Sequence, residues 1–333
     1  MKHSRFIVAV LLFAGLARAQ HPDAGTVAFP FLNLSYDARA VAMGGANAGI
    51  PNGVYGVLSN PASIAFEKRM QVMGGFRQII MDIWGGPLAF LYPMSKGVLA
   101  ANLTTLTSGD FNVVSEDGKE SGALARSNFI SGGLSWAQLI NAELSAGFTI
   151  KGVYNYLGAD GQYYSADGFA LDGGIQYRTL NDRLVYGAVF RNVGLMRSGY
   201  SGASSDRYPF PYCVEMGISY VPKYIPKLRV ALDVNKKRGD YLNFEPGVEL
   251  SPLDNLFLRL GYAFSLQDFE KQVIDALRGV NDEDYQKSSA NSLSLGAGMA
   301  TSVDQVNLKL DVALQFHVDN TIPALLISVI AGF

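Results

Sequence analysis

The feature that most constrains this chain is the alternation of apolar and polar residues over its last thirty positions, 304–333. Apolar side chains occupy every second position from Val306 to Phe316, and mostly polar residues lie between them. A period of two is typical of a β-strand with one apolar face and one wet face. After a turn at residues 318–321, a second apolar strand runs to the chain end at Phe333.

This last strand points to a barrel in a membrane. An open apolar edge recruits other chains, whereas a closed barrel in lipid removes the edge and gives the apolar face a solvent. We therefore interpret the two strands as the closing hairpin of an outer-membrane barrel. The residues on the apolar face of the final strand, which we take as a C-terminal membrane-assembly signal, are Leu325, Ile327, Val329, Ala331 and Phe333.

The start of the chain predicts export. Residues 1–19 have a basic beginning, an apolar stretch from Phe6 to Leu16, and an A-x-A cleavage site at positions 17–19, which together define a secretory signal peptide. The mature chain then begins at Gln20. Cys213 is the only cysteine, so no intrachain disulfide is expected, and a lipid-anchored N-terminus is not expected either.

Composition narrows the class further. Beyond the signal there is no run of eighteen uncharged apolar residues, so we expect no transmembrane helix. Hydrophobic residues nevertheless make up 49% of the chain, charged ones only 17%, and there are 36 Gly and 17 Tyr, which suits strands that alternate between lipid and lumen. A net charge of −2 argues against nucleic acid as a partner, because phosphate-binding surfaces need clustered Lys and Arg.

From Met70 onward the pattern predicts fourteen strands, most of them about the length that a tilted strand needs to cross a bilayer core. They form a transmembrane antiparallel β-barrel over residues 67–333. The predicted segments are 70–80, 83–93, 97–107, 128–137, 142–156, 168–178, 183–192, 212–221, 227–235, 242–250, 256–264, 292–301, 306–317 and 322–333.

The connections provide an independent test of this barrel. Those after even-numbered strands are short, whereas four after odd-numbered strands are long: 108–127, 157–167, 193–211 and 265–291. Short periplasmic turns and long outer loops are typical of bacterial outer-membrane barrels. A soluble β-sandwich, barrel or solenoid also alternates, but it does not need the terminal apolar strand, the signal peptide and the asymmetric loops together.

The last long connection has the pattern of a helix that starts at Ser265 and ends near Gly279. Its apolar stripe, Phe269, Val273, Ile274 and Leu277, would pack on the barrel rim or bind a partner. The acidic run at 282–284 is interpreted as a solvated loop rather than a metal site, and we expect neither a metal nor a cofactor.

Residues 20–66 differ from the barrel and are predicted to form a hatch or plug inside it. Arg39 would be costly there without a carboxylate partner, and Gly44-Gly45 would let the backbone approach the wall. Asn60-Pro61-Ala62 either contacts a ligand or is a structural turn. The candidate binding residues are thus Arg39, Gly44, Gly45, Asn60, Pro61 and Ala62.

Five carboxylates on predicted lumen faces could pair with Arg39: Asp172, Asp233, Glu245, Glu249 and Asp311. Their alternative role, which we favour, is to neutralise basic side chains on the same faces. Those basic residues are Arg178, Arg191, Arg229, Arg259 and Lys309.

The sequence offers little for catalysis. Only three histidines are present, and His317 could form a hydrolase triad only with Asp319 and a serine such as Ser328. No nucleophile motif surrounds any serine, and a triad is recognised by geometry rather than by spacing. We therefore expect a protein that is not an enzyme.

The plug region also carries a resemblance. It has Phe-Leu-Asn-Leu at 31–34, Ala-Arg-Ala-Val-Ala-Met-Gly-Gly-Ala at 38–46, and Asn-Pro-Ala at 60–62. This combination resembles the PorV/PorQ family of outer-membrane barrels, which are related to the FadL long-chain fatty-acid transporter. The resemblance implies a FadL-like barrel of fourteen strands with an N-terminal hatch, in the outer membrane of a Gram-negative-type bacterium.

Two functions follow from the resemblance. Similarity to PorV/PorQ implies a component of the type IX secretion system, which engages exported cargo or other secretion proteins at its extracellular side. Similarity to FadL implies the alternative, a transporter that passes a hydrophobic small molecule through the hatch and out by a lateral opening. Outer-membrane lipid is a partner in both cases.

Overall fold

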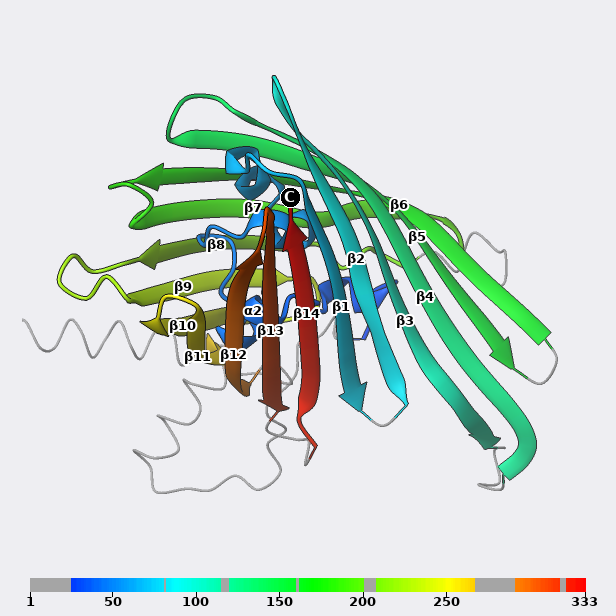
Figure 1. The fold of residues 1–333 in the computed structure, drawn as a ribbon. Helices are drawn as coiled ribbons and strands as arrows, with labels where there is room; N and C mark the ends of the chain where they lie inside the picture. The colour runs from blue at the N-terminus through cyan, green and yellow to red at the C-terminus, as the bar shows by residue number, and fades with distance from the viewer. Residues whose placement is uncertain are drawn as a thin grey trace, which may run out of the picture.

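The computed structural model describes residues 25–80, 82–114, 120–159, 162–200, 208–266, 291–317 and 322–333. Fourteen antiparallel strands form one closed barrel, as the sequence predicted (Figure 1). The strands are β1 (Gln71–Ile80), β2 (Ile83–Met94), β3 (Gly97–Val114), β4 (Glu120–Leu139), β5 (Leu144–Ala159), β6 (Gln162–Thr179), β7 (Leu184–Ser198), β8 (Cys213–Tyr220), β9 (Leu228–Lys237), β10 (Leu242–Leu253), β11 (Leu256–Ser265), β12 (Ser292–Val303), β13 (Val306–His317) and β14 (Ala324–Gly332).

The barrel closes where its first and last strands meet. β14 pairs with β13 on one side and with β1 on the other, in a register that sets Gln71 opposite Gly332. The closing hairpin predicted from the C-terminal alternation is therefore confirmed. In β14 the inward positions are the buried ones, such as Leu326 and Ser328, and the five residues of the proposed assembly signal face outward.

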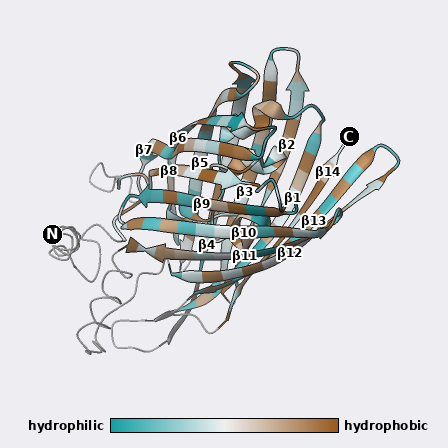
Figure 2. Ribbon diagram, turned by 90° about the vertical axis from the view of Figure 1, so that its left-hand side faces the viewer, coloured by the Kyte–Doolittle hydropathy of each residue, from teal (hydrophilic) through white to brown (hydrophobic). Residues whose placement is uncertain are grey.

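The two ends of the barrel differ. One end, which we call the inner end, holds the start of β1, the end of β14 and the short turns from each even-numbered strand to the next. The outer end carries the other connections. Along the wall, apolar positions alternate with polar or small ones (Figure 2). In β9, for example, Val230 and Leu232 are exposed on the outer face, whereas Ala231 and Asp233 are buried in the interior.

The wall is higher on one side than the sequence predicted. β3, β4 and β6 have 18, 20 and 18 residues, and β7 reaches Ser198 rather than residue 192. Parts of the expected loops 108–127 and 157–167 are thus paired strand. Their outer portions are rich in Ser, Asp, Gly and Tyr, so the alternation of apolar residues fades although the backbone ladder continues.

The N-terminal segment, residues 25–66 as described here, lies inside the ring of strands (Figure 1, blue). It consists of short helices: η2 (Pro30–Asn33), α2 (Ala38–Ala42), η3 (Gly53–Leu58) and η4 (Pro61–Phe66). α2 contacts β11 to β14, and η4 contacts β3 to β6 on the other side. The segment therefore crosses the lumen from wall to wall.

Three predictions fall outside the described residues: the signal peptide, most of the helix expected at 265–279, and the acidic run at 282–284. No helix among the described residues is long and apolar enough to cross a membrane.

Candidate functional site

The site is the part of the lumen that the N-terminal segment occupies. α2 starts at Asp37, whose carboxylate accepts hydrogen bonds from the backbone N–H groups of Arg39 and Ala40 at 2.8 and 3.2 Å. This N-cap orients the helix so that Arg39 points toward the wall of β10. Burial raises the pKa of Asp37 to about 6.

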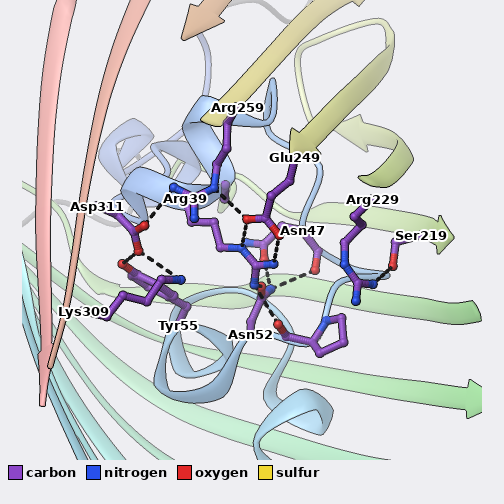
Figure 3. Close-up of polar contacts among 12 residues, drawn as sticks. Arg39, Asn47, Asn52, Tyr55, Ser219, Arg229, Glu249, Arg259, Lys309 and Asp311 are labelled. Carbon is purple, nitrogen blue, oxygen red and sulfur yellow. Dashed lines mark hydrogen bonds and ion pairs between the residues drawn. The ribbon is translucent and has the colours of Figure 1, made fainter. Parts of the chain in front are cut away.

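Glu249 holds the Arg39 guanidinium. Arg39 donates to its two carboxylate oxygens through Nε at 2.9 Å and Nη2 at 2.7 Å, a bidentate pair that fixes both position and orientation. Arg39 Nη1 also donates to the carbonyl of Pro51 at 2.8 Å, which ties α2 to the following loop. Of the five candidate carboxylates, the barrel thus presents Glu249 to this arginine (Figure 3).

The contacts of Glu249 extend to charged side chains of the wall. Arg259 donates to Glu249 at 2.7 Å and to Asp311 at 2.8 Å, and the side chains of Arg259 and Asp311 are fully buried. Asp311 in turn accepts from the Tyr55 hydroxyl at 2.7 Å and lies 3.2 Å from the Lys309 ammonium. The two roles considered for these acids therefore coincide, because Glu249 and Asp311 each hold the N-terminal segment while they neutralise wall cations.

A second attachment uses backbone rather than side chains. One oxygen of Asp233 accepts from the N–H groups of Asn47 and Ala48, each at 2.6 Å. Gly44 and Gly45 precede these residues with positive φ angles of 76° and 105°. A side chain at Gly44 would overlap the backbone of Tyr262, so glycine is needed there both for conformation and for space; Gly45 needs it for its conformation.

The Asn60-Pro61-Ala62 motif attaches the segment on the other side. Asn60 caps η4 by accepting from Ala62 N–H at 3.1 Å, and its amide donates to the carbonyls of Ala48 and Ile175 at 3.1 and 3.2 Å. Ser145 of β5 donates to the Ala62 carbonyl at 2.8 Å. The motif therefore has the contacts of a structural turn that links two parts of the segment to the wall.

The wall is shaped to receive this backbone. At seven inward-facing glycines, an added side chain would begin less than 3.0 Å from an atom of the N-terminal segment. The segment thus lies directly on the backbone of these strands, and any larger residue would displace it. These seat glycines are Gly147, Gly174, Gly187, Gly217, Gly247, Gly261 and Gly296, on β5 to β8 and β10 to β12.

Sequence reasoning missed part of the charge pattern. Asp172 pairs with Lys151 at 2.8 Å, and Arg191 pairs with Glu215 at 2.6 Å; neither Lys151 nor Glu215 was among the predicted lumen charges. Lys151 follows the inward parity of Thr149 on β5, so the alternation contained the signal. Two cations expected to pair with carboxylates make other contacts instead: Arg178 donates to Ser63 O at 3.0 Å, and Arg229 to the Ser219 hydroxyl at 2.8 Å.

The N-terminal segment separates two cavities. The middle cavity, of about 100 Å³, is enclosed between residues 31–37, 45, 47 and 57–59 and the walls of β3 to β10. The inner vestibule, of about 650 Å³, opens at the inner end and is bordered by Arg39, Asn52, Tyr55 and the ends of the adjacent strands. The residues between Asp37 and Asn52 therefore form a partition across the lumen.

One side of the outer lumen, along β3 to β7, carries an apolar cluster. Phe29 and Phe31 of the N-terminal segment are buried there, against inward-facing residues of β3 to β7 and the segment before β8. Phe29 packs edge-on against Phe210 with ring centroids 5.3 Å apart, and Phe31 lies 4.8 Å from Phe129. The wall residues of this outer apolar cluster are Leu106, Val153, Ala166, Ala170, Met196 and Phe210.

The wall has a step beside this cluster. β8 begins at Cys213, opposite Arg191, whereas β7 continues to Ser198, so residues 192–198 of β7 extend beyond the β8 ladder. At about 3.3 Å per residue, the step is about 23 Å long. It starts where Asn192 adopts a left-handed conformation, φ 57°, and donates its N–H to Asp172 at 2.8 Å.

The step lies next to the N-terminal segment. Ala28 N–H donates to the Pro209 carbonyl at 2.9 Å, and the Tyr208 N–H lies 3.2 Å from the Met196 sulfur. On the outer face of the same stretch, Val193 and Leu195 are 50% and 65% exposed, as lipid-facing residues are. Among the described residues, the segment before β8 and the residues around Ala28 thus lie against the step from within.

The described residues bear on two kinds of centre, a metal site and the serine–histidine pair. No group of three His, Cys, Asp or Glu in them is placed to hold a metal ion. Ser328 lies opposite Asp311 and accepts from Ala38 N–H at 3.2 Å, whereas His317 is six residues further along β13, about 20 Å away at the rise of a strand. The serine and histidine considered as a triad are therefore not brought together.

These features define a closed fourteen-stranded barrel whose lumen is blocked by its own N-terminal segment. No family model and no curated protein sequence matches the chain. Solved structures do. The Pseudomonas putida toluene transporter TodX is similar over 90% of this chain and 96% of its own, with a TM-score of 0.60 and 15% identity. The CymD monoaromatic hydrocarbon channel is similar over 92% and 98%, with a TM-score of 0.58 and 15% identity.

At this level of identity the likeness establishes the fold alone. The barrel is the FadL-like, fourteen-stranded type predicted from the sequence. None of these neighbours is a PorV or PorQ protein, so the finer resemblance noted in residues 31–62 stays a prediction.

Proposed function

We propose that this protein is a non-enzymatic channel of the bacterial outer membrane that admits apolar small molecules. The observation that carries the proposal is the outer apolar cluster beside the step between β7 and β8. An apolar solute that leaves this cluster can enter lipid without crossing water, because the cluster and the lipid-facing surface meet at the step.

The occupied lumen argues against an open, water-filled pore for polar solutes. An open porin has a water-filled lumen, whereas here the centre is occupied by the N-terminal segment and its ion pairs. TodX, a toluene transporter, and CymD, a monoaromatic hydrocarbon channel, share this fold. Their likeness supports the proposal without identifying the solute.

The outer-membrane location rests on three supports. The chain begins with a secretory signal pattern, its strands close into a barrel, and the outer face of that barrel is apolar, with Leu171, Ile175 and Leu260 all about half exposed. A barrel of this kind satisfies all backbone hydrogen bonds internally, as a membrane core requires.

The test is the entry of an apolar dye, phenylnaphthylamine, into cells of a Gram-negative host that expresses the protein. The dye fluoresces when it reaches phospholipid, and an intact outer membrane slows it. We expect faster entry than in cells with an empty vector. Ala170→Phe, which fills the outer apolar cluster from the lumen side, should slow entry, and Leu171→Phe, on the lipid face of the same strand, should not.

Equal entry with and without the protein would contradict the proposal. Folding of each variant is checked by the gel shift of unheated samples, since closed barrels migrate differently before and after heating. A role in type IX secretion remains a prediction from the sequence resemblance. It is decided by a pull-down from detergent-solubilised outer membranes, in which bound secreted proteins without apolar ligands would favour secretion over transport.

A further inference from the structure

The N-terminal segment is attached unevenly to the wall. All seven seat glycines lie on β5 to β8 and β10 to β12, and the partners Asp233, Glu249 and Asp311 lie on β9, β10 and β13. Separating the segment from this side would leave buried charges and backbone N–H groups without partners, which is strongly unfavourable. This side of the segment is therefore fixed.

The opposite side is different. Against β1 to β4, η3 and η4 make apolar contacts through residues such as Val54, Val57 and Ile64, all buried. The wall side of this contact, which we call the apolar seam, consists of Met73, Ala89, Leu91, Val98, Ala100 and Ala137. Among the described residues, polar contacts on this side lie near the two ends of the seam. At one end Gln71 accepts from Val54 N–H at 2.9 Å and donates to Glu67 at 2.7 Å, and at the other Arg77 donates to the Ser35 carbonyl.

The apolar seam connects the two cavities. Tyr55 and Ile330 belong to the buried cluster of the seam and also line the inner vestibule. Val57 and Leu58 belong to the same cluster and line the middle cavity. The seam therefore borders both cavities, and its side chains are apolar except for the hydroxyl of Tyr55, which donates to Asp311 at the vestibule end.

We propose that apolar solutes cross the partition along the apolar seam, between η3–η4 and β1–β4, while the fixed side of the segment stays in place. This deepens the proposed function and rests on it. Apolar contacts can part without leaving an unsatisfied donor or acceptor, and a solute of the same chemistry replaces the contacts that are lost. Rotamer changes of residues such as Val57 and Leu91 provide the motion, so the segment itself need not leave the barrel.

A matched pair of substitutions tests this path. Val57→Ala removes two methyl groups from the seam, and Val41→Ala removes the same two groups from the contact of α2 with β13 and β14 on the fixed side. The two valines are equally buried, at 3% and 2% exposure. Dye entry into cells, normalised to the amount of folded protein, is the measurement.

We expect Val57→Ala to speed dye entry by about threefold, because the residual cavity widens the path, and Val41→Ala to leave the rate unchanged. Equal rates for both variants and the parent would overturn the seam, as would a larger increase for Val41→Ala. The failure of the proposed function looks different, since the parent protein would then give no dye entry above the empty vector.

Discussion

Among single residues, Glu249 has the most demanding position. It accepts a bidentate pair from Arg39 in the N-terminal segment and a further bond from Arg259 in the wall, while its own side chain is only 7% exposed. Two guanidinium groups therefore share this carboxylate, and Arg259 has Asp311 as a second partner. Removing its charge leaves both cations buried without full compensation.

Glu249→Gln tests this dependence. We expect the free energy that holds the N-terminal segment in place to fall by roughly 3 to 5 kcal/mol, the usual cost of breaking a buried ion pair. Hydrogen exchange of the backbone amides around Arg39 measures the change. Asp110→Asn is the control, because its pair with Arg126 is about half exposed and should contribute about 0 to 1 kcal/mol. Equal protection in the two variants would contradict the account.

Asp37 gives a dependence on pH. Burial raises its pKa from the usual 3.8 to about 6, so the protonated form is favoured when the segment is docked. The corresponding stabilisation is fully present below pH 3.8 and is lost as the pH rises through 6, about 3 kcal/mol in all.

We therefore compare the hydrogen-exchange rate of the α2 amides, corrected for the intrinsic rate, between pH 4 and pH 7. This rate should rise more in the parent protein than in Asp37→Asn. The asparagine oxygen can still cap the helix, but it does not titrate. The same pH slope in both proteins would show that other groups account for it.

The sequence predicted which face of a strand each side chain occupies, because alternation sets the face. It did not predict which residues contact one another across the lumen, because strand register sets those partners. All five predicted carboxylates do lie on the lumen side, because alternation fixes the face of a strand. The choice of Glu249 for Arg39, and of Asp233 for two backbone N–H groups, depends on how far each strand is shifted against a segment more than a hundred residues away. No local pattern contains that shift.

At the level of elements, the glycine seats explain how a helix and its loop fit against a sheet without side chains between them. Gly261 on β11 lies beneath Met43 and Gly44, and Gly247 on β10 lies beneath Met43. The sequence showed many glycines in the strands but could not show which ones face the segment. The close approach expected of Gly44 and Gly45 does occur, and the wall glycines are what permit it.

Gly261→Ala should therefore displace the segment, because its methyl group would overlap the backbone of Met43 and Gly44. Gly152→Ala is the matched control on β5, where nothing lies within 4 Å of the added carbon. We expect faster exchange of the amides at residues 42–46, or failure to fold, in the first variant alone. Parent-like exchange in Gly261→Ala would show that the wall gives way at little cost.

Element boundaries show where sequence reasoning ended. Strands inside the expected membrane zone were placed within a few residues, for example β9 and β13, because lipid imposes apolar outward positions. The outer extensions of β3, β4 and β7 were assigned to loops, because strands beyond the membrane need no apolar face. That extension matters for function, since it creates the step between β7 and β8.

Across the whole molecule, one segment gives the lumen two unlike sides. Ion pairs and glycine seats hold it on one wall, and apolar side chains meet on the other. The inner vestibule and the middle cavity lie on either side of it, and the outer apolar cluster leads to the step in the wall. This organisation predicts a barrel that passes apolar solutes while it excludes ions.

The most direct test measures both properties of the same preparation: dye entry in cells that express the protein, and ion conductance of the purified protein in planar bilayers. We predict dye entry above the empty vector together with conductance near the background of the bilayer. Dye entry accompanied by a large, steady ion current would mean an open aqueous pore and would contradict the partition. The absence of both dye entry and ion current would contradict the proposed channel itself.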